Sequence, residues 1–233
     1  MTSPRLLGRT IALLFLFTIV TGIIAQGFIS ERLLSGSADT VAENILTHRG
    51  LYLFGFTVYL LEMASQVVTA ALWYILLRPV NRSVALSAAF LELSGCIIKS
   101  FARVFYIVPL YIVAGGGPAH ALDGLTTQQL QAIALISFHV NNQGAGMALA
   151  FFGFSTILNG YLIFRSTFLP RWIGVLAMIS GLGWLTFIYP PLGYGLFLFA
   201  ALIGLLSSVV MIVRLLIGVN EERWKECAKR TAA

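Results

Sequence analysis

The sequence predicts an all-α fold, a polytopic membrane bundle of six transmembrane helices with both termini in the cytoplasm. Three observations predict it: the composition, the length of the apolar segments, and the distribution of lysine and arginine. Of the 233 residues, 58% are hydrophobic and only 10% are charged, whereas about a quarter of the residues in a soluble domain are charged. The net charge of +6 comes from short basic segments between apolar runs. This pattern excludes soluble enzymes and nucleic-acid-binding proteins.

Six apolar segments are long enough to cross a bilayer, whose core of about 30 Å requires about 20 helical residues. The expected spans are residues 9–29, 51–77, 83–113, 132–164, 171–190 and 193–214. The connection YPPLGYG is predicted to be a tight turn, because Pro190 and Pro191 cannot continue a helix. We expect one transmembrane domain over residues 1–219 and a charged cytoplasmic tail over residues 220–233.

The two longest connections are expected to carry local structure. The segment ADTVAENILTHRG has apolar residues at helical spacing: Val41, Ile45 and Leu46. With Asp39 as its cap, this segment predicts a short helix on the outer surface. In the second connection, GGGP at residues 115–118 predicts flexible chain. Thr126 and Gln129 have the spacing of a capping box that starts the fourth spanning helix.

Lysine and arginine are distributed unequally between the two sides of the predicted bundle. One side has two of them, Arg32 and Arg49. The other side has 11 of them: Arg5, Arg9, Arg78, Arg82, Arg165, Arg171, Arg214, Arg223, Lys225, Lys229 and Arg230. Because cytoplasmic flanks carry the excess of positive charge, the 11 to 2 distribution predicts that both termini are cytoplasmic.

Four formal charges lie inside the predicted spans: Glu62, Glu92, Lys99 and Arg103. A charged side chain at the centre of a spanning helix costs about 2.5–3.5 kcal/mol, so these charges require partners, water or a ligand. Counting about 1.5 Å per residue from the helix ends places Glu62 and Lys99 at similar depth, which predicts an ion pair. The sequence indicates no partner for Glu92. Arg103 lies near the outer boundary and is expected to extend outward to the interface.

The spacing of the polar residues predicts one polar face on each of the second, third and fourth spans. The candidate ligand-binding residues are Glu62, Gln66, Glu92, Lys99, Arg103, His139, Asn142 and Gln143. The glycines of the fourth span and of SGLGW are interpreted as positions of close helix packing. No metal site or cofactor is predicted, because the histidine clusters, zinc-protease motifs and phosphate-binding loops that hold such groups do not occur.

Several segments together resemble a known family. LLRPVNRSVALSAAFLEL at 76–93, FFGFSTILNGYLIFRSTFLPRWIGVLAMISGLGW at 151–184 and the opening RLLGRTIALLFLFTIVTGI are similar to the bacterial multi-pass proteins of domain-of-unknown-function family 4386. The resemblance spans nearly the whole chain, and GYLIFRS followed by FLPRWIGVL is its most specific part. It implies a polytopic protein of the bacterial cytoplasmic (inner) membrane. It implies no substrate and no catalytic residue.

Three functions stay open at the level of sequence. In the first, the polar faces form a pocket that binds, or transports, a small anionic solute or a lipid-like ligand. In the second, Glu62 or Glu92 is the catalytic residue of an intramembrane acid–base enzyme that acts on a lipid or an isoprenoid, as an isomerase or cyclase does. In the third, the protein is structural or accessory, and the buried charges only hold the helices together. The partner common to all three is the lipid bilayer.

Overall fold

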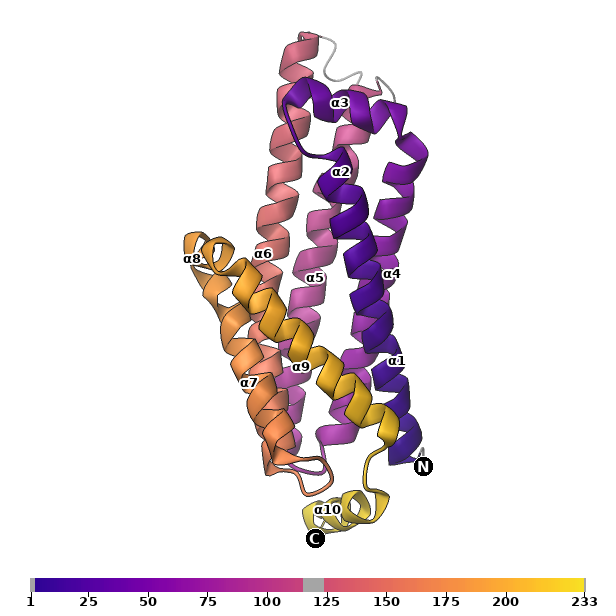
Figure 1. Cartoon of the computed structure of the whole chain (residues 1–233), viewed down its shortest axis with the longest axis vertical. Helices are drawn as coiled ribbons and strands as arrows, with labels where there is room; N and C mark the ends of the chain where they lie inside the picture. The colour runs from indigo at the N-terminus through magenta and orange to yellow at the C-terminus, as the bar shows by residue number, and fades with distance from the viewer. Residues whose placement is uncertain (1–2, 115–123, 233) are drawn as a thin grey trace. The chain divides into compact units, whose positions relative to one another are not determined.

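The computed structural model describes residues 3–114 and 124–232, and every regular element in these ranges is helical (Figure 1). Within them, six helices are long and apolar enough to cross a membrane: Pro4–Leu33, Arg49–Leu77, Arg82–Val113, Thr127–Arg165, Arg171–Ile188 and Phe197–Ile217. The prediction of an all-α protein with six spanning helices is therefore confirmed. The orientation of the termini stays a prediction.

The first spanning helix changes its geometry along its length. It begins as α1 (Pro4–Gly22), continues as a π-helical segment (Ile23–Ser30) and ends as α2 (Glu31–Leu33). The wider π-helical turn is rare and appears mostly as short insertions in α-helices, frequently at functional sites. The second to fourth spanning helices are α4 (Arg49–Leu77), α5 (Arg82–Val113) and α6 (Thr127–Arg165).

The connection between the last two spans is helical, so the prediction of a simple tight turn was wrong. A 3-10 turn (Thr186–Ile188) follows α7 (Arg171–Leu185), and a short helix, α8 (Pro190–Gly195), precedes α9 (Phe197–Ile217). Both prolines lie in the first turn of α8. Proline is favourable there, because the N–H groups of a first turn have no partner within the helix.

The connection after the first span contains the predicted surface helix, and the connection before the fourth span contains the predicted capping box. The surface helix forms as α3 (Ala38–Thr47), but its cap is Ser37, whose hydroxyl accepts a hydrogen bond from the Thr40 N–H at 3.4 Å. Asp39 instead lies in the first turn, where a negative charge is also favourable. The predicted capping box is confirmed, since the Gln129 Oε1 accepts from the Thr126 N–H at 2.8 Å. The predicted flexible GGGP segment lies outside the described residues.

The chain divides into two compact units, each assembled from separated segments. The first unit comprises Met1–Phe17, Ser65–Ile97 and Gly146–Ala233, and the second comprises Thr18–Ala64 and Ile98–Ala145. The helices α4, α5 and α6 each contribute one part to each unit. The residues of the predicted single domain, 1–219, are thus distributed over both units.

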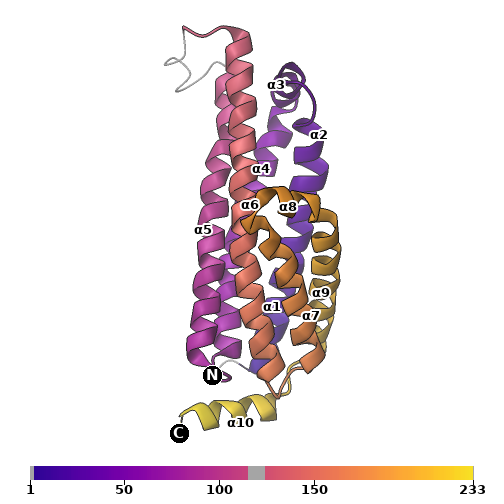
Figure 2. The same cartoon turned by 90° about the vertical axis from the view of Figure 1, so that its left-hand side faces the viewer.

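In the first unit, glycines bring α6 and α7 into backbone contact. A Cβ at Gly153 would lie 2.8 Å from the Gly181 carbonyl oxygen, and a Cβ at Gly160 would lie 2.8 Å from the Gly174 carbonyl oxygen. Figure 2 shows the two helices side by side. The contact of Gly153 with Gly181 confirms the predicted close packing.

The predicted tail forms a helix, α10 (Glu221–Ala232), that packs against the rest of the first unit. It lies crosswise to α7 and α9 (Figures 1 and 2). The Trp224 Nε1 donates a hydrogen bond to the Leu76 carbonyl at 2.9 Å, and an Arg223 Nη1 donates to the Thr167 carbonyl at 3.2 Å. These bonds hold α10 against the C-terminal end of α4 and the connection between α6 and α7.

The second unit has one continuous apolar core. It joins the π-helical segment, α2 and α3 to the first half of α4, the second half of α5 and the first half of α6. Its members are Ala25, Ile29, Leu33, Leu34, Val41, Ile45, Tyr52, Val58, Tyr59, Tyr106, Leu110 and Phe138. The surface helix α3 lies crosswise to α4 and buries Val41 and Ile45 in this core (Figure 1).

Candidate functional site

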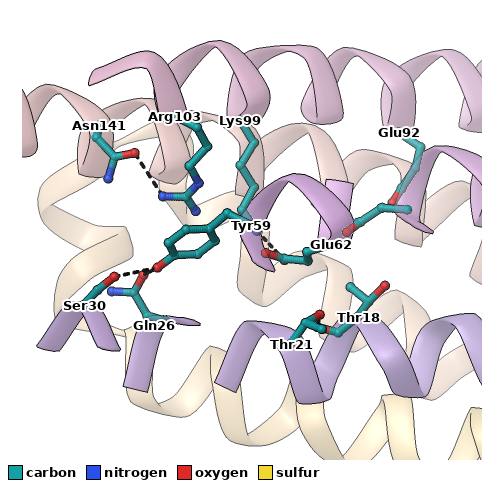
Figure 3. Close-up of polar contacts among 11 residues, drawn as sticks. Thr18, Thr21, Gln26, Ser30, Tyr59, Glu62, Glu92, Lys99, Arg103 and Asn141 are labelled. Atoms are coloured by element: carbon teal, nitrogen blue, oxygen red, sulfur yellow. Dashed lines mark hydrogen bonds and ion pairs between the residues drawn. The ribbon is translucent and has the colours of Figure 1, made fainter. Parts of the chain in front are cut away.

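The second unit contains a buried ion pair between α4 and α5. The Lys99 Nζ lies 2.7 Å from the Glu62 Oε1, and the two side chains are 14% and 6% exposed (Figure 3). It is the one ion pair found in the part of the chain that the structure describes. The predicted pairing of Glu62 with Lys99 is confirmed.

One helical turn beyond Lys99, Arg103 is buried in the same unit. Its residue is 2% exposed. Its Nη1 donates a hydrogen bond to the Asn141 Oδ1 at 2.9 Å, and its Cζ lies 3.5 Å from the centroid of the Tyr59 ring. The expectation that Arg103 extends outward was wrong, because an aromatic face of α4 and an amide of α6 hold the guanidinium inside.

Tyr59 connects the guanidinium to the π-helical segment. Its hydroxyl donates to the Gln26 Oε1 at 2.7 Å and shares a hydrogen bond of 2.9 Å with the Ser30 Oγ. Figure 3 shows this hydroxyl directed at Gln26 and Ser30, with Arg103 over the ring. Gln26 and Ser30 were missed as site residues, although Gln26 is a polar residue inside the predicted first span.

The polar residues predicted to face inward from α6 are not the ones that do so: the inward amide is Asn141 and not the predicted Asn142. Asn141 is buried and binds Arg103, whereas His139 and Gln143 are exposed and Asn142 is half-buried. The inward face follows the pattern i, i+3, i+4, i+7: Ala134, Ser137, Phe138 and Asn141. The apolar members of this pattern were a better indicator of the inward face than the polar residues alone.

Glu92 and Gln66 belong to the first unit and not to this cluster. The Gln66 Nε2 donates a hydrogen bond to the Glu92 Oε1 at 2.8 Å. Gln66 is therefore a partner of Glu92 that the sequence did not indicate. Gln66 and Glu92 thus form a separate polar pair in the first unit, and both candidate cations, Lys99 and Arg103, lie in the second unit.

The polar cluster of the second unit has unused hydrogen-bonding groups. Three of its buried atoms have no hydrogen-bond partner among the described residues: Glu62 Oε2, Arg103 Nε and the Tyr106 hydroxyl. Most buried polar atoms in proteins are paired, so each exception requires an explanation. No group of three or more metal-binding side chains occurs in the described residues.

The comparisons with known proteins identify the family. The model of a protein family described as a domain of unknown function, DUF4386, matches residues 10–218. The chain belongs to the DUF4386 family. The match to DUF4386 begins within the first spanning helix, covers the other five completely and ends before α10. The comparisons with curated proteins and with solved structures found no match.

DUF4386 membership confirms the resemblance seen in the sequence and assigns no chemistry to the residues described above.

Proposed function

We propose that this DUF4386 protein is a multi-pass membrane protein that binds a small anionic solute or an anionic lipid-like group at the polar cluster of its second unit. The observation that supports the proposal most strongly is the environment of Arg103. Its guanidinium is buried, yet its hydrogen bond goes to a neutral amide and its ring contact to a neutral phenol. Burying a charge without an opposite charge is costly, and an anionic ligand would offset that cost.

The alternative in which the charges are only structural explains part of the cluster. Lys99 and Glu62 neutralise each other across α4 and α5, as interhelical packing requires. Arg103 has no such counter-ion in the described part of the chain. If Arg103 only filled space between the helices, an apolar residue would serve as well. Replacing even paired buried charges with packed hydrophobic residues is often neutral or stabilising. The binding function therefore has the better support.

Retention of a ligand by the purified protein tests the proposal. Native mass spectrometry of the full chain extracted in a mild detergent should detect a bound anion or lipid on the parent protein. The adduct should be lost from Arg103→Gln and retained by Arg49→Gln, which removes an exposed arginine of the same unit. Fragmentation of the adduct distinguishes a solute from a lipid.

Arg103→Lys is a second variant that keeps the charge but loses the planar set of donors. It should bind the adduct more weakly than the parent does. Identical adducts on all four proteins, or none on any of them, would contradict the proposed function.

We also propose that the protein lies in the bacterial cytoplasmic membrane with both termini in the cytoplasm, supported by the 11 to 2 distribution of positive residues. A fluorescent-protein reporter fused to the C-terminus should therefore fluoresce, and alkaline phosphatase fused there should be inactive. Phosphatase fused after Gly36, in the first outer connection, should be active as a positive control. An active phosphatase at the C-terminus would reverse the proposed orientation.

A further inference from the structure

The polar cluster of the second unit carries one more positive than negative charge. Its formally charged groups are Glu62 and Arg103, which are buried, and Lys99, whose side chain is 14% exposed, and their charges sum to +1. The other acidic and basic side chains that the structure describes in this unit are exposed: Glu31, Arg32, Asp39, Glu43, His48, Arg49 and His139. These groups lie at the surface and outside the buried cluster, where charges are screened more than in the interior, so they are not counted in its charge balance.

From this charge balance we infer that the site prefers anions with a single negative charge, such as a short carboxylate or sulfonate, over divalent anions. The inference rests on the proposed function and names the ligand class of the same site. A monovalent anion brings the buried charge from +1 to zero. A divalent anion would bring it to −1, which leaves an uncompensated charge in a medium of low dielectric constant.

The hydrogen-bonding groups support the same preference. Lys99 is already engaged by the Glu62 carboxylate, so Arg103 is the cation whose charge is uncompensated. The Arg103 Nη1 is bound to Asn141, while the buried Nε has no partner among the described residues. Arginine presents its donors in a planar fork that fits one oxyanion group.

Among the described residues of this unit, the second cation near Arg103 is Lys99, and Glu62 already compensates its charge, so a divalent ligand would find no second uncompensated cation. The Tyr59 ring covers one face of the guanidinium. The Tyr106 ring packs edge-on against Tyr59 at 5.3 Å between centroids, and Phe138 lies 6.4 Å from Tyr106. This aromatic surface keeps the anion in contact with Arg103 and away from bulk water.

Methanesulfonate and sulfate test this inference, because they share a tetrahedral sulfur centre and differ in carrying one and two negative charges. Isothermal titration of the purified full chain in neutral detergent, with potassium salts at equal ionic strength, would measure both affinities. We expect saturable binding of methanesulfonate and a dissociation constant at least about tenfold higher for sulfate. Arg49→Gln should behave as the parent does, and Arg103→Gln should lose the saturable component.

The thermal unfolding midpoint is a second measurement of binding, and it does not require that binding release or absorb a detectable amount of heat. Sulfate stabilises folded proteins generally by exclusion from their surface, so the shift specific to the site is the shift of the parent minus that of Arg103→Gln. If Arg103→Gln does not fold, the parent is compared with Arg103→Lys, and methanesulfonate should raise the unfolding midpoint of the parent by more than that of Arg103→Lys.

Sulfate binding as tightly as methanesulfonate, or tighter, would overturn the preference for one charge but leave the proposed function standing. Saturable binding of neither anion to the parent would overturn the preference and count against the proposed function as well.

Discussion

Replacing Lys99 with methionine should lower the free energy of unfolding by about 3–5 kcal/mol, because removing one partner of a buried ion pair leaves the other charge uncompensated. Glu62 would then be a buried carboxylate without its cation, since its Oε1 is bound to Lys99 and its Oε2 has no partner in the described residues. The measurement is unfolding of the purified protein in detergent by added denaturing detergent, followed by tryptophan fluorescence.

Two double variants control for this effect. Lys99→Met combined with Glu62→Leu removes both charges and should recover most of the lost stability. The exchange Glu62→Lys with Lys99→Glu restores the pair in the opposite order and should recover folding as well. An unchanged free energy of unfolding in Lys99→Met alone would show that the pair does not stabilise the second unit.

The exchanged pair also separates structure from function. If Lys99 and Glu62 only hold α4 and α5 together, the exchanged protein should bind anions as the parent does. The exchange moves the positive charge from α5 to α4 relative to Arg103. A well-folded exchanged protein that has lost binding would therefore place the pair in the ligand site.

The spans and the ion pair could be predicted because strong physical constraints fix them. A helix that crosses the bilayer must be long and apolar, and an ionised residue inside it must find a partner at its own depth. Glu62 and Lys99 were the carboxylate and amine at matching depth. No comparable constraint determined the α10 helix, whose position depends on single hydrogen bonds such as that from Trp224 to Leu76.

The parts of the site that were missed depend on contacts between helices distant in the sequence. Arg103 is turned inward by the ring of Tyr59, which lies on another helix. Asn141 rather than Asn142 faces the core because the apolar pattern through Phe138 sets the rotation of α6. The π-helical geometry that carries Gln26 and Ser30 was not predicted, since the segment IIAQGFIS is mostly apolar and continues the first span without a break.

The largest effect expected outside the polar cluster is at Gly174, where α7 meets α6. A Cβ added there would lie 2.5 Å from both the Gly160 carbonyl oxygen and the Phe164 backbone nitrogen. Backbone atoms of a packed helix cannot move aside as a flexible side chain can, so α6 and α7 would have to separate. Gly174→Val should cost about 3 kcal/mol or more, at or above the usual range for an overfilled core.

A graded series in the first unit makes this prediction specific. Gly183→Ala should have a smaller effect, because its Cβ would lie 3.3 Å from the Ala200 Cβ, a side-chain atom. Gly195→Ala, in α8, should be neutral, since no atom that the structure describes lies within 4 Å of the added Cβ. The free energy of unfolding in detergent should therefore fall in the order Gly195→Ala, Gly183→Ala, Gly174→Val. Equal stabilities across the series would mean that α6 and α7 are not held together by close backbone contact.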